Sequence, residues 1–325
     1  MSKLIKISDR ASWDSGVNSS LWGHPLQLFG WGELKKDNSW EPYRFKLDSH
    51  DVFAQVLLWK IPGTSLRIAY VPRGPVGDPN SKNTAELLGE LVLWCKSQKV
   101  IYLRIEPAWV MDTGLKRWVV AKNEIQLSKT YTLDLNKTLD QLLEPMAKKT
   151  RQYIRKAERD GIKVTQSNDM TQMYELYQLT SARAGFGIHP IEYYQKLMDE
   201  LGIYNKLYYA VVDKETVAFL WLASSGSTAY ELYGGVNENG QLSKANYLLK
   251  WHAICDSKKQ GMKIYDFNGR LNDGVSNFKH GFAPDDTDYI GSYDYVINKT
   301  AYRFWVGLFP MLKPIGRKVK RALGK

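Results

Sequence analysis

A lysine next to an aromatic residue, Phe278-Lys279, follows a turn-rich segment at 268–274 and is a first candidate for chemistry. Its ammonium group could meet a carbonyl or a phosphate, and the ring could stack on a base or sugar. The sequence has no Gly-x-Ser-x-Gly elbow, P-loop, His-Glu-x-x-His or Cys-x-x-Cys. This leaves proximity chemistry, in which two bound substrates are aligned and developing charge is stabilised.

Metal chemistry is not expected. Five histidines are scattered at positions 24, 50, 189, 252 and 280, none at metal-ligand spacing. Cys95 and Cys255 fall in amphipathic, helix-like stretches of different halves of the chain, so neither a disulfide nor a zinc site is expected. We therefore predict no metal and no cofactor.

A basic segment at 148–163 is a second candidate. Arg151, Arg155 and Arg159 are four apart and share one helix face. Together with Lys156 they could follow the phosphates of tRNA, with salt-sensitive binding, although a solvated helix face is the competing interpretation. The formal net charge of +11 favours a polyanionic ligand such as tRNA, a nucleotide sugar or an anionic membrane surface.

The elements that must position these residues form a loose internal repeat. Residues 70–76 and 230–236 are both strand-like runs that stop at glycine. Each is followed by a helix-like segment (84–97; 243–259) and a second strand (100–105; 263–267). Two copies of this unit predict two similar α/β lobes side by side, and the cleft between them is the expected site.

The chain of 325 residues is long enough for two domains, each with its own core. Residues 130–135 alternate apolar and polar side chains and are expected to close the first lobe. No low-complexity linker follows, so we expect tightly docked lobes with a boundary near 135–140.

The last 25 residues, 301–325, combine apolar positions with a terminal basic run. Such an anchor beside a basic cluster suits contact with a membrane surface. The alternative is that the aromatic part packs on the first lobe and only the basic end is free. The start of the sequence shows no signal peptide, so we expect a cytoplasmic protein, peripheral at the inner face of the plasma membrane if the tail binds lipid.

In their order and spacing, several motifs resemble those of the Fem-type (FemABX) aminoacyltransferases, which build peptidoglycan cross-bridges. The similarity runs over about residues 25–296, and its motifs lie at 30–35, 40–42, 70–78, 102–107, 189–194, 230–235, 265–269, 278–279 and 289–291. The resemblance implies an α/β (α+β) fold of two tandem GNAT-like acyltransferase domains, with mixed, mostly antiparallel sheets flanked by helices. The domains would span 1–136, completed by 297–325, and 137–296.

The resemblance also implies roles for individual residues. Lys279 would stabilise charge in the transfer step, and Glu106, where the family pattern has aspartate, could orient or deprotonate the acceptor amine. At His189 the pattern often has arginine, and phosphate contact would raise the pKa of this histidine. The substrate-binding matches are Lys35 and His189 at the diphosphate, Tyr102, Tyr193 and Tyr233 in the precursor cleft, and Phe278 at the tRNA acceptor end.

The implied activity is tRNA-dependent transfer of an amino acid to the stem-peptide amine of a cell-wall precursor. Its partners would be aminoacyl-tRNA and either UDP-MurNAc-pentapeptide or lipid II. The long helical arm of some members is missing, so the chain is similar to the small, arm-less type, and we expect a monomer. Two alternatives stay open: an acyl-CoA N-acyltransferase, whose pyrophosphate motif is not found at 72–78 or 233–240, and a non-catalytic basic protein that binds membrane or RNA.

Overall fold

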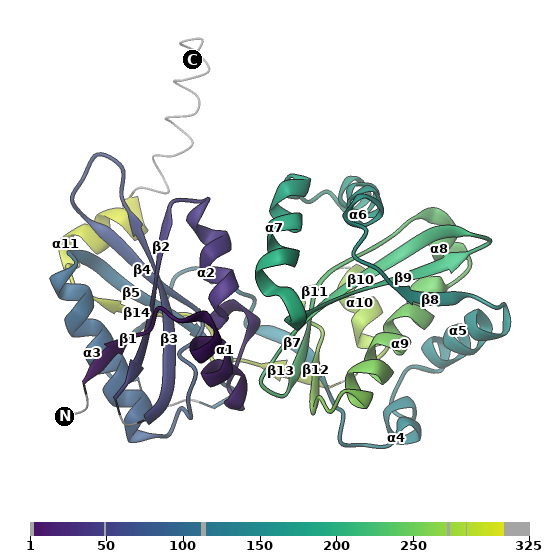
Figure 1. Cartoon of the computed structure of the whole chain (residues 1–325), viewed down its shortest axis with the longest axis horizontal. Coiled ribbons are helices and arrows are strands. Elements are labelled where there is room, and N and C mark those ends of the chain that lie inside the picture. Colours follow the sequence, from purple (N-terminus) through teal and green to yellow (C-terminus); the bar gives the residue numbers. More distant parts are fainter. Residues whose placement is uncertain (1–2, 49, 112–114, 272–273, 284, 309–325) are drawn as a thin grey trace, which may run out of the picture.

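The computed structural model describes residues 3–48, 50–111, 115–271, 274–283 and 285–308, which form two lobes side by side (Figure 1). The first sheet contains, in spatial order, β1 (Leu4–Lys6), β2 (Trp40–Leu47), β3 (His50–Lys60), β4 (Arg67–Arg73), β5 (Val100–Pro107), β14 (Tyr293–Val296) and β6 (Val119–Val120). The second contains β8 (Lys163–Gln166), β9 (Asn205–Val212), β10 (Glu215–Ser225), β11 (Thr228–Val236), β12 (Ile264–Asp266), β7 (Lys129–Asp134) and β13 (Asp286–Asp288).

Helices flank both sheets (Figure 1). They are α1 (Arg10–Ser19), α2 (Phe29–Lys36), α3 (Lys82–Ser97), α4 (Leu139–Leu143), α5 (Lys148–Arg159), α6 (Met170–Ala184), α7 (Ile191–Leu201), α8 (Glu238–Leu242), α9 (Ala245–Lys259), α10 (Gly274–His280) and α11 (Lys299–Tyr302). The predicted α/β class, with two mixed sheets between helices, is confirmed. Within the described residues no helix is both long and apolar enough to cross a bilayer.

The predicted internal repeat is present in both lobes. Strands β4 and β5 are parallel neighbours joined through α3, and β11 and β12 are parallel neighbours joined through α8 and α9. The other strand pairs of the described residues are antiparallel. A parallel pair needs a long crossover, and the helices supply it. Cys95 lies in α3 and Cys255 in α9, in different lobes, and both are free thiols.

The two sheets exchange a strand. The expectation that residues 130–135 close the first lobe is wrong, because β7 pairs with β12 and β13 in the second sheet. In return, β14 pairs with β5 and β6 in the first sheet. Alternating apolar and polar residues suit a strand in either sheet, so the pattern could not choose. The domain boundaries at 136/137 and 296/297 stay predictions. Strand β7 precedes the first boundary but belongs to the second sheet, and β14 precedes the second boundary but belongs to the first sheet.

A hydrophobic core continues from one lobe into the other. Trp13 and Leu34 of the first lobe belong to the same buried cluster as Tyr194, Leu197 and Trp221 of the second. All five side chains are at most 1% exposed. Burial of such large apolar surfaces is the main favourable term in docking. The lobes are therefore tightly docked, as expected.

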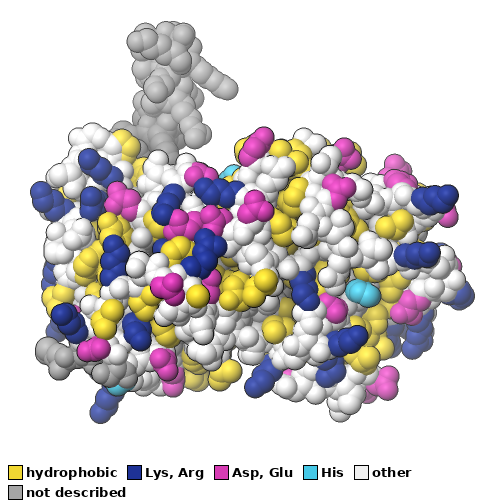
Figure 2. Space-filling model, viewed as in Figure 1, with side chains coloured by type: hydrophobic (Ala, Val, Ile, Leu, Met, Phe, Trp, Pro, Cys, Tyr) yellow, Lys and Arg dark blue, Asp and Glu magenta, His cyan; other side chains and the backbone are white. Residues whose placement is uncertain are grey.

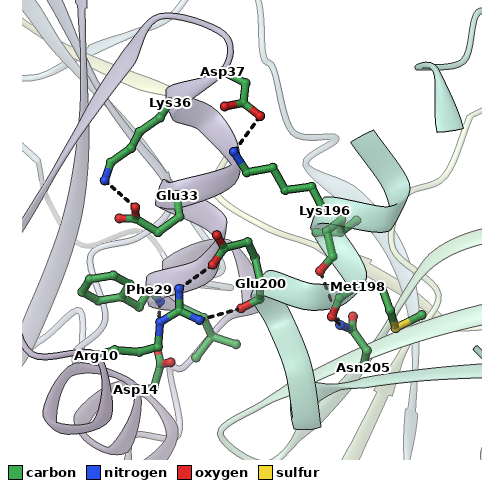
Figure 3. Close-up of polar contacts among 12 residues, drawn as sticks. Arg10, Asp14, Phe29, Glu33, Lys36, Asp37, Lys196, Met198, Glu200 and Asn205 are labelled. Carbon is green, nitrogen blue, oxygen red and sulfur yellow. Dashed lines mark hydrogen bonds and ion pairs between the residues drawn. The ribbon is translucent and has the colours of Figure 1, made fainter. Parts of the chain in front are cut away.

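Helices α2 and α7 meet at this junction (Figure 3). A Cβ atom at Gly30 would lie 1.9 Å from the carbonyl oxygen of Glu200, so the contact requires glycine. Arg10 forms an ion pair with the Glu200 carboxylate, and Lys196 lies 2.6 Å from the carboxylate of Asp37. Partly exposed ion pairs contribute little to stability, so close helix packing is the main constraint.

The segment after β14 packs on the first lobe. Tyr302 contacts the ring of Tyr102, with centroids 5.3 Å apart, and Trp305 contacts Trp59 at 5.8 Å. The alternative in which the aromatic part packs back is therefore confirmed for Tyr302, Trp305 and Val306. Residues 309–325, which carry the basic run, lie outside the described residues.

Replacing Gly30 with alanine is expected to destabilise the protein by about 1–3 kcal/mol, because the added methyl group must push α2 away from α7. The measurement is the midpoint of urea unfolding. The matched control is Gly89→Ala in α3, where an added Cβ meets no atom within 4 Å. That change should stabilise the protein by about 0.5–1 kcal/mol. Equal midpoints for Gly30→Ala and the native protein would contradict the packing argument.

Candidate active site

The second lobe has a cleft where β11 and β12 separate. The two strands are paired only from Thr228 to Tyr230, and β12 then ends at Asp266 while β11 continues. A pocket of about 640 Å³ occupies this position, and its lining includes three residues predicted from the sequence: Tyr233, Phe278 and Lys279. The structure thus brings together side chains that are about 45 positions apart.

The matching strands of the first lobe do not separate. Strands β4 and β5 stay paired as far as Arg73 and Pro107. Near the end of this pairing, the Glu106 side chain accepts hydrogen bonds from the backbone of Ile125 and Gln126, so a loop covers this end. The two lobes share a fold, but the splayed strands belong to the second.

A bulge in β11 sets the orientation of Tyr233. Tyr233 pairs with Trp221 and Glu231 with Leu222, so Leu232 is an extra residue between them. Regular alternation would place residues 231 and 233 on the same face of the sheet. The bulge instead directs Tyr233 toward the lobe junction, while Glu231 turns toward α9. One strand therefore supplies both the junction and the cleft.

Lys279 is held at the wall of the pocket. Its Nζ atom donates a hydrogen bond of 2.9 Å to the carbonyl of Gly269 and contacts the carbonyl of Asn268 at 3.4 Å. Both acceptors lie in a turn with positive φ, 52° at Asn268 and 99° at Gly269. The turn-rich segment noted in the sequence thus positions the ammonium group. A held cation is suited to stabilising charge that develops in a transition state.

The sequence analysis missed an ion pair at the floor of the pocket. Lys250 and Glu231 both line the pocket, are nearly fully buried, and lie 2.5 Å apart from Nζ to Oε1. Rings of Phe267 and Phe278 lie 5.0 and 5.2 Å from the ammonium. Burial lowers the pKa of Lys250, the charge of Lys279 lowers it further, and Glu231 opposes both. No spacing in the sequence signals a pair that forms between a strand and a helix.

Across the junction, α2 and α7 bring Lys35 to Tyr193. The Lys35 Nζ donates a hydrogen bond of 3.0 Å to the Tyr193 hydroxyl and lies 4.3 Å from the ring centroid of Trp31. Burial lowers the pKa of Lys35 to about 8. Protonation of this lysine therefore opposes folding below about pH 8, and this cost is relieved as the pH rises toward the ordinary value of 10.5.

Tyr193 connects Lys35 to the cleft residue Tyr233. Burial raises the pKa of Tyr193 to about 12. Burial also raises the pKa of Tyr233 far above its ordinary value, and neighbouring tyrosines, Tyr193 and Tyr194 foremost, raise it further. Both phenols therefore stay neutral and can donate hydrogen bonds. The predicted residues Lys35, Tyr193 and Tyr233 form one continuous group.

His189 belongs to the same group. Its ring stacks on Tyr193 at 4.0 Å, and its side chain is exposed. Burial of part of the ring and the charge of Lys35 lower its pKa. The expectation of a raised pKa concerned the phosphate-bound form, in which an anion between Lys35 and His189 would favour the imidazolium.

Two predicted residues lie apart from this group in the described contacts. Tyr102 packs against Tyr302 and beside Arg104. The Glu106 side chain accepts four hydrogen bonds, which occupy both of its carboxylate oxygens: Tyr70 Oη at 2.5 Å, Ile125 N at 2.6 Å, Gln126 N at 3.1 Å and the Ser292 hydroxyl. This geometry favours a positioning residue for the surrounding loops over an acceptor of protons, and its predicted catalytic role stays a prediction.

Asp266 is similarly engaged. It accepts hydrogen bonds from Thr130 at 2.6 Å, from the Tyr289 hydroxyl at 2.5 Å and from the backbone of Asn268 at 2.7 Å. It therefore fixes the turn that carries the Lys279 acceptors. In the part of the chain that the structure describes, no group of three His, Cys, Asp or Glu side chains could hold a metal ion.

The predicted basic helix is α5, and its four predicted tRNA-binding residues differ in their contacts and exposure. Arg151 donates to the carbonyls of Glu144 and Met146 at 2.7 and 2.6 Å and so holds the turn between α4 and α5. Lys156 pairs with an aspartate one turn later. Arg155 and Arg159 are exposed. On the face in Figure 2, Lys and Arg side chains are spread over both lobes among acidic ones. Contact with tRNA stays a prediction for all four.

Two lobes with this strand and helix order, one of them with splayed strands, define a tandem GNAT-like protein. A tandem GNAT protein of clavulanic acid biosynthesis superposes with a TM-score of 0.52 at 10% identity, over 90% of this chain and 98% of that one. The model of the FemAB family matches residues 12–117, 116–218 and 213–308, so the chain belongs to the FemAB family.

Similar proteins cover nearly the whole chain. A lipid II:glycine glycyltransferase of Staphylococcus epidermidis is 23% identical over 402 aligned positions, which cover 95% of this chain and 97% of that one. A UDP-N-acetylmuramoylpentapeptide-lysine N(6)-alanyltransferase of Weissella viridescens is 23% identical and covers 89% and 94%. The crystal structure of FemX superposes with a TM-score of 0.86 at 21% identity, over 93% of this chain and 99% of that one.

Binding of a diphosphate at Lys35 is expected to weaken as the pH rises from 7 to 9, because an ammonium with a pKa of about 8 is lost there. The measurement is calorimetric titration with UDP-N-acetylglucosamine, whose diphosphate keeps its charge over this range. Lys35→Arg should bind with little pH dependence, since a guanidinium stays protonated. Lys36→Ala, on the exposed side of α2, is the matched control. A flat profile for the native protein would contradict the assignment.

Glu106→Gln is expected to destabilise the protein by about 1–3 kcal/mol, because an amide NH₂ would replace one of two acceptor oxygens that each face donors. Urea unfolding measures the change. Glu144→Gln, at an exposed position of the second lobe, should change stability by less than about 0.5 kcal/mol. If both variants were equally stable, the positioning role of Glu106 would be wrong.

Proposed function

We propose that this protein is a peptidyl N-aminoacyltransferase of peptidoglycan cross-bridge synthesis. It would move an amino acid from aminoacyl-tRNA to the stem-peptide amine of UDP-MurNAc-pentapeptide or lipid II. The observation that carries the proposal is that Lys279 and Tyr233 line one pocket. Tyr233 in turn contacts Tyr193, whose hydroxyl accepts a hydrogen bond from Lys35. Membership of the FemAB family and the names of the staphylococcal and Weissella relatives support it.

The two groups of residues suit two anionic substrates. Lys35, with His189 beside it at the lobe junction, would bind the diphosphate of the acceptor, and its contact with Tyr193 supports this role. Phe278 and Lys279, which line the pocket, would bind the acyl end of the donor. The tyrosines between them would line the path of the stem peptide. Alignment of two bound substrates is itself a large part of catalysis.

The transfer needs little chemistry from the protein. The acceptor amine attacks the ester carbonyl, a C–N bond forms, and the ribose oxygen leaves with a proton that originates on the amine. Lys279 would stabilise the oxyanion of the tetrahedral intermediate. Because Glu106 and Asp266 are already engaged in hydrogen bonds, groups of the substrates are better placed to carry the proton.

A lipid-linked acceptor would require contact with a membrane surface. We propose that the protein is cytoplasmic and reaches the inner face of the plasma membrane through residues 301–325. Phe304 is 50% exposed at the start of this segment, and the basic positions that follow would attract anionic lipid.

Lys279→Ala is expected to lower kcat by about 10²- to 10³-fold with a smaller effect on KM, because the lost cation acts on developing charge. The assay follows a radiolabelled amino acid from charged tRNA to UDP-linked or lipid-linked muropeptide. Lys259→Ala, at the exposed end of α9, is the matched control and should keep native rates.

Two results would count against the proposal. One is absence of transfer by the native protein with every amino acid. The other is full activity of Lys279→Ala, which would show that the pocket is not the reaction site.

A further inference from the structure

We propose that a strip of aromatic rings and lysines, which begins at the pocket wall and leads away from it, binds the single-stranded 3′ end of the tRNA donor. The acceptor-end strip consists of Phe278, Tyr247, Tyr153, Lys149 and Lys244. It rests on the proposed function, because it takes the donor to be aminoacyl-tRNA. It adds residues that the sequence analysis did not select, and it places the first contacts of the RNA beside the pocket.

The rings of the strip are continuous. Phe278, which lines the pocket, contacts Tyr247 with centroids 4.8 Å apart, and Tyr247 contacts Tyr153 at 4.9 Å. The three rings come from α10, α9 and α5, which pack together in the second lobe (Figure 1). Each is partly exposed. A path of aromatic surface therefore leads from Lys279 to the basic helix α5.

Two ammonium groups converge on the far ring of the strip. Lys149 Nζ lies 5.6 Å and Lys244 Nζ 5.1 Å from the ring centroid of Tyr153. Among the described residues, no ion pair joins either lysine to an acidic side chain. Two like charges near one ring repel each other, and a bound anion would relieve this repulsion.

The backbone also holds one of these lysines in place. Lys244 precedes α9 with φ at 65°, a left-handed conformation that residues other than glycine seldom adopt. Its Nζ donates a hydrogen bond of 2.8 Å to the carbonyl of Gln241. The backbone conformation and this hydrogen bond thus fix the position of the Lys244 ammonium beside the ring of Tyr153.

Single-stranded RNA fits this combination. Bases stack on aromatic rings while phosphates contact lysines, and the resulting binding does not depend on base sequence. The ester carbonyl must reach Lys279, so the last nucleoside would lie near Phe278. The nucleotides before it would then pass over Tyr247 and Tyr153. Arg151, by contrast, is engaged by carbonyls of the α4–α5 turn.

The first experiment replaces both lysines. The double variant Lys149→Ala/Lys244→Ala should raise KM for aminoacyl-tRNA about tenfold or more. The slope of the logarithm of the tRNA binding constant against the logarithm of the salt concentration should become shallower by about 1.4, the value for two single-strand phosphate contacts. The matched control, Lys82→Ala/Lys96→Ala, removes the same charge from the exposed face of α3 in the first lobe and should leave both quantities unchanged.

A short donor tests the direction of the strip. An aminoacyl ester of adenosine ends at Phe278 and has no nucleotide to place over Tyr153. With this donor the kcat/KM of the double variant should stay within about twofold of the native value, because the chemistry at Lys279 is untouched. An equal loss with both donors would overturn the proposal and indicate damage to the fold or the reaction site.

The second experiment tests stacking. Tyr153→Leu should raise KM for aminoacyl-tRNA about tenfold, whereas Tyr153→Phe keeps the ring face and should restore native binding.

Native KM and native salt dependence in the lysine double variant would overturn the proposal. So would a loss of binding to anionic phosphatidylglycerol vesicles with unchanged KM for tRNA, since the strip would then be a membrane contact.

Failure of the proposed function gives a different result. In that case the native protein transfers nothing from aminoacyl-tRNA or from the adenosine ester. If the native enzyme is active with both donors and the strip variants behave as the native enzyme does, the role of the acceptor-end strip is refuted while the proposed function stands.

Discussion

The close contact of α2 with α7 is the constraint on which the site depends. Because Gly30 has no side chain, the two helices approach until the backbone at Glu200 fills that space. Lys35 comes after Gly30 in α2 and Tyr193 comes before Glu200 in α7, and the same approach of the helices brings the Lys35 ammonium within 3.0 Å of the Tyr193 hydroxyl. The junction core makes this arrangement rigid. An acceptor bound there would meet a surface that is already formed, and little ordering would oppose its binding.

The two lobes have diverged in what they do with the same unit. In the first lobe the paired strands are closed, and Glu106 ties together loops around them. In the second lobe the strands part, and the gap holds Lys279 above the buried pair of Lys250 and Glu231. An ammonium held by fixed carbonyls, as Lys279 is, needs no rearrangement when nearby charge develops. The second lobe thus contains the open pocket, whereas the first has closed strands and contributes Lys35 at the junction.

Local pattern in the sequence was sufficient for the repeat and the α/β class. The set of Lys35, Tyr193, Tyr233 and Lys279 came instead from the resemblance to the Fem-type enzymes, and the structure brings these residues to the pocket and the lobe junction. The local sequence could not show that Glu106 is fully engaged, since its donors come from loops distant in sequence. It missed the Lys250–Glu231 pair, which depends on the bulge at Leu232. It also placed β7 in the wrong sheet, because alternation specifies a strand but not its neighbours.

The exchange of β7 and β14 has a consequence for synthesis on the ribosome. Arg104 in β5 and Asp294 in β14 form a buried, two-point ion pair across 190 positions of the chain. Until β14 emerges, the first sheet lacks an interior strand, and Arg104 lacks the carboxylate of Asp294. Long-range pairing of this kind is slow and leaves strand edges open in the meantime. The nascent amino-terminal half therefore has to wait, incomplete, for the final strand to be translated.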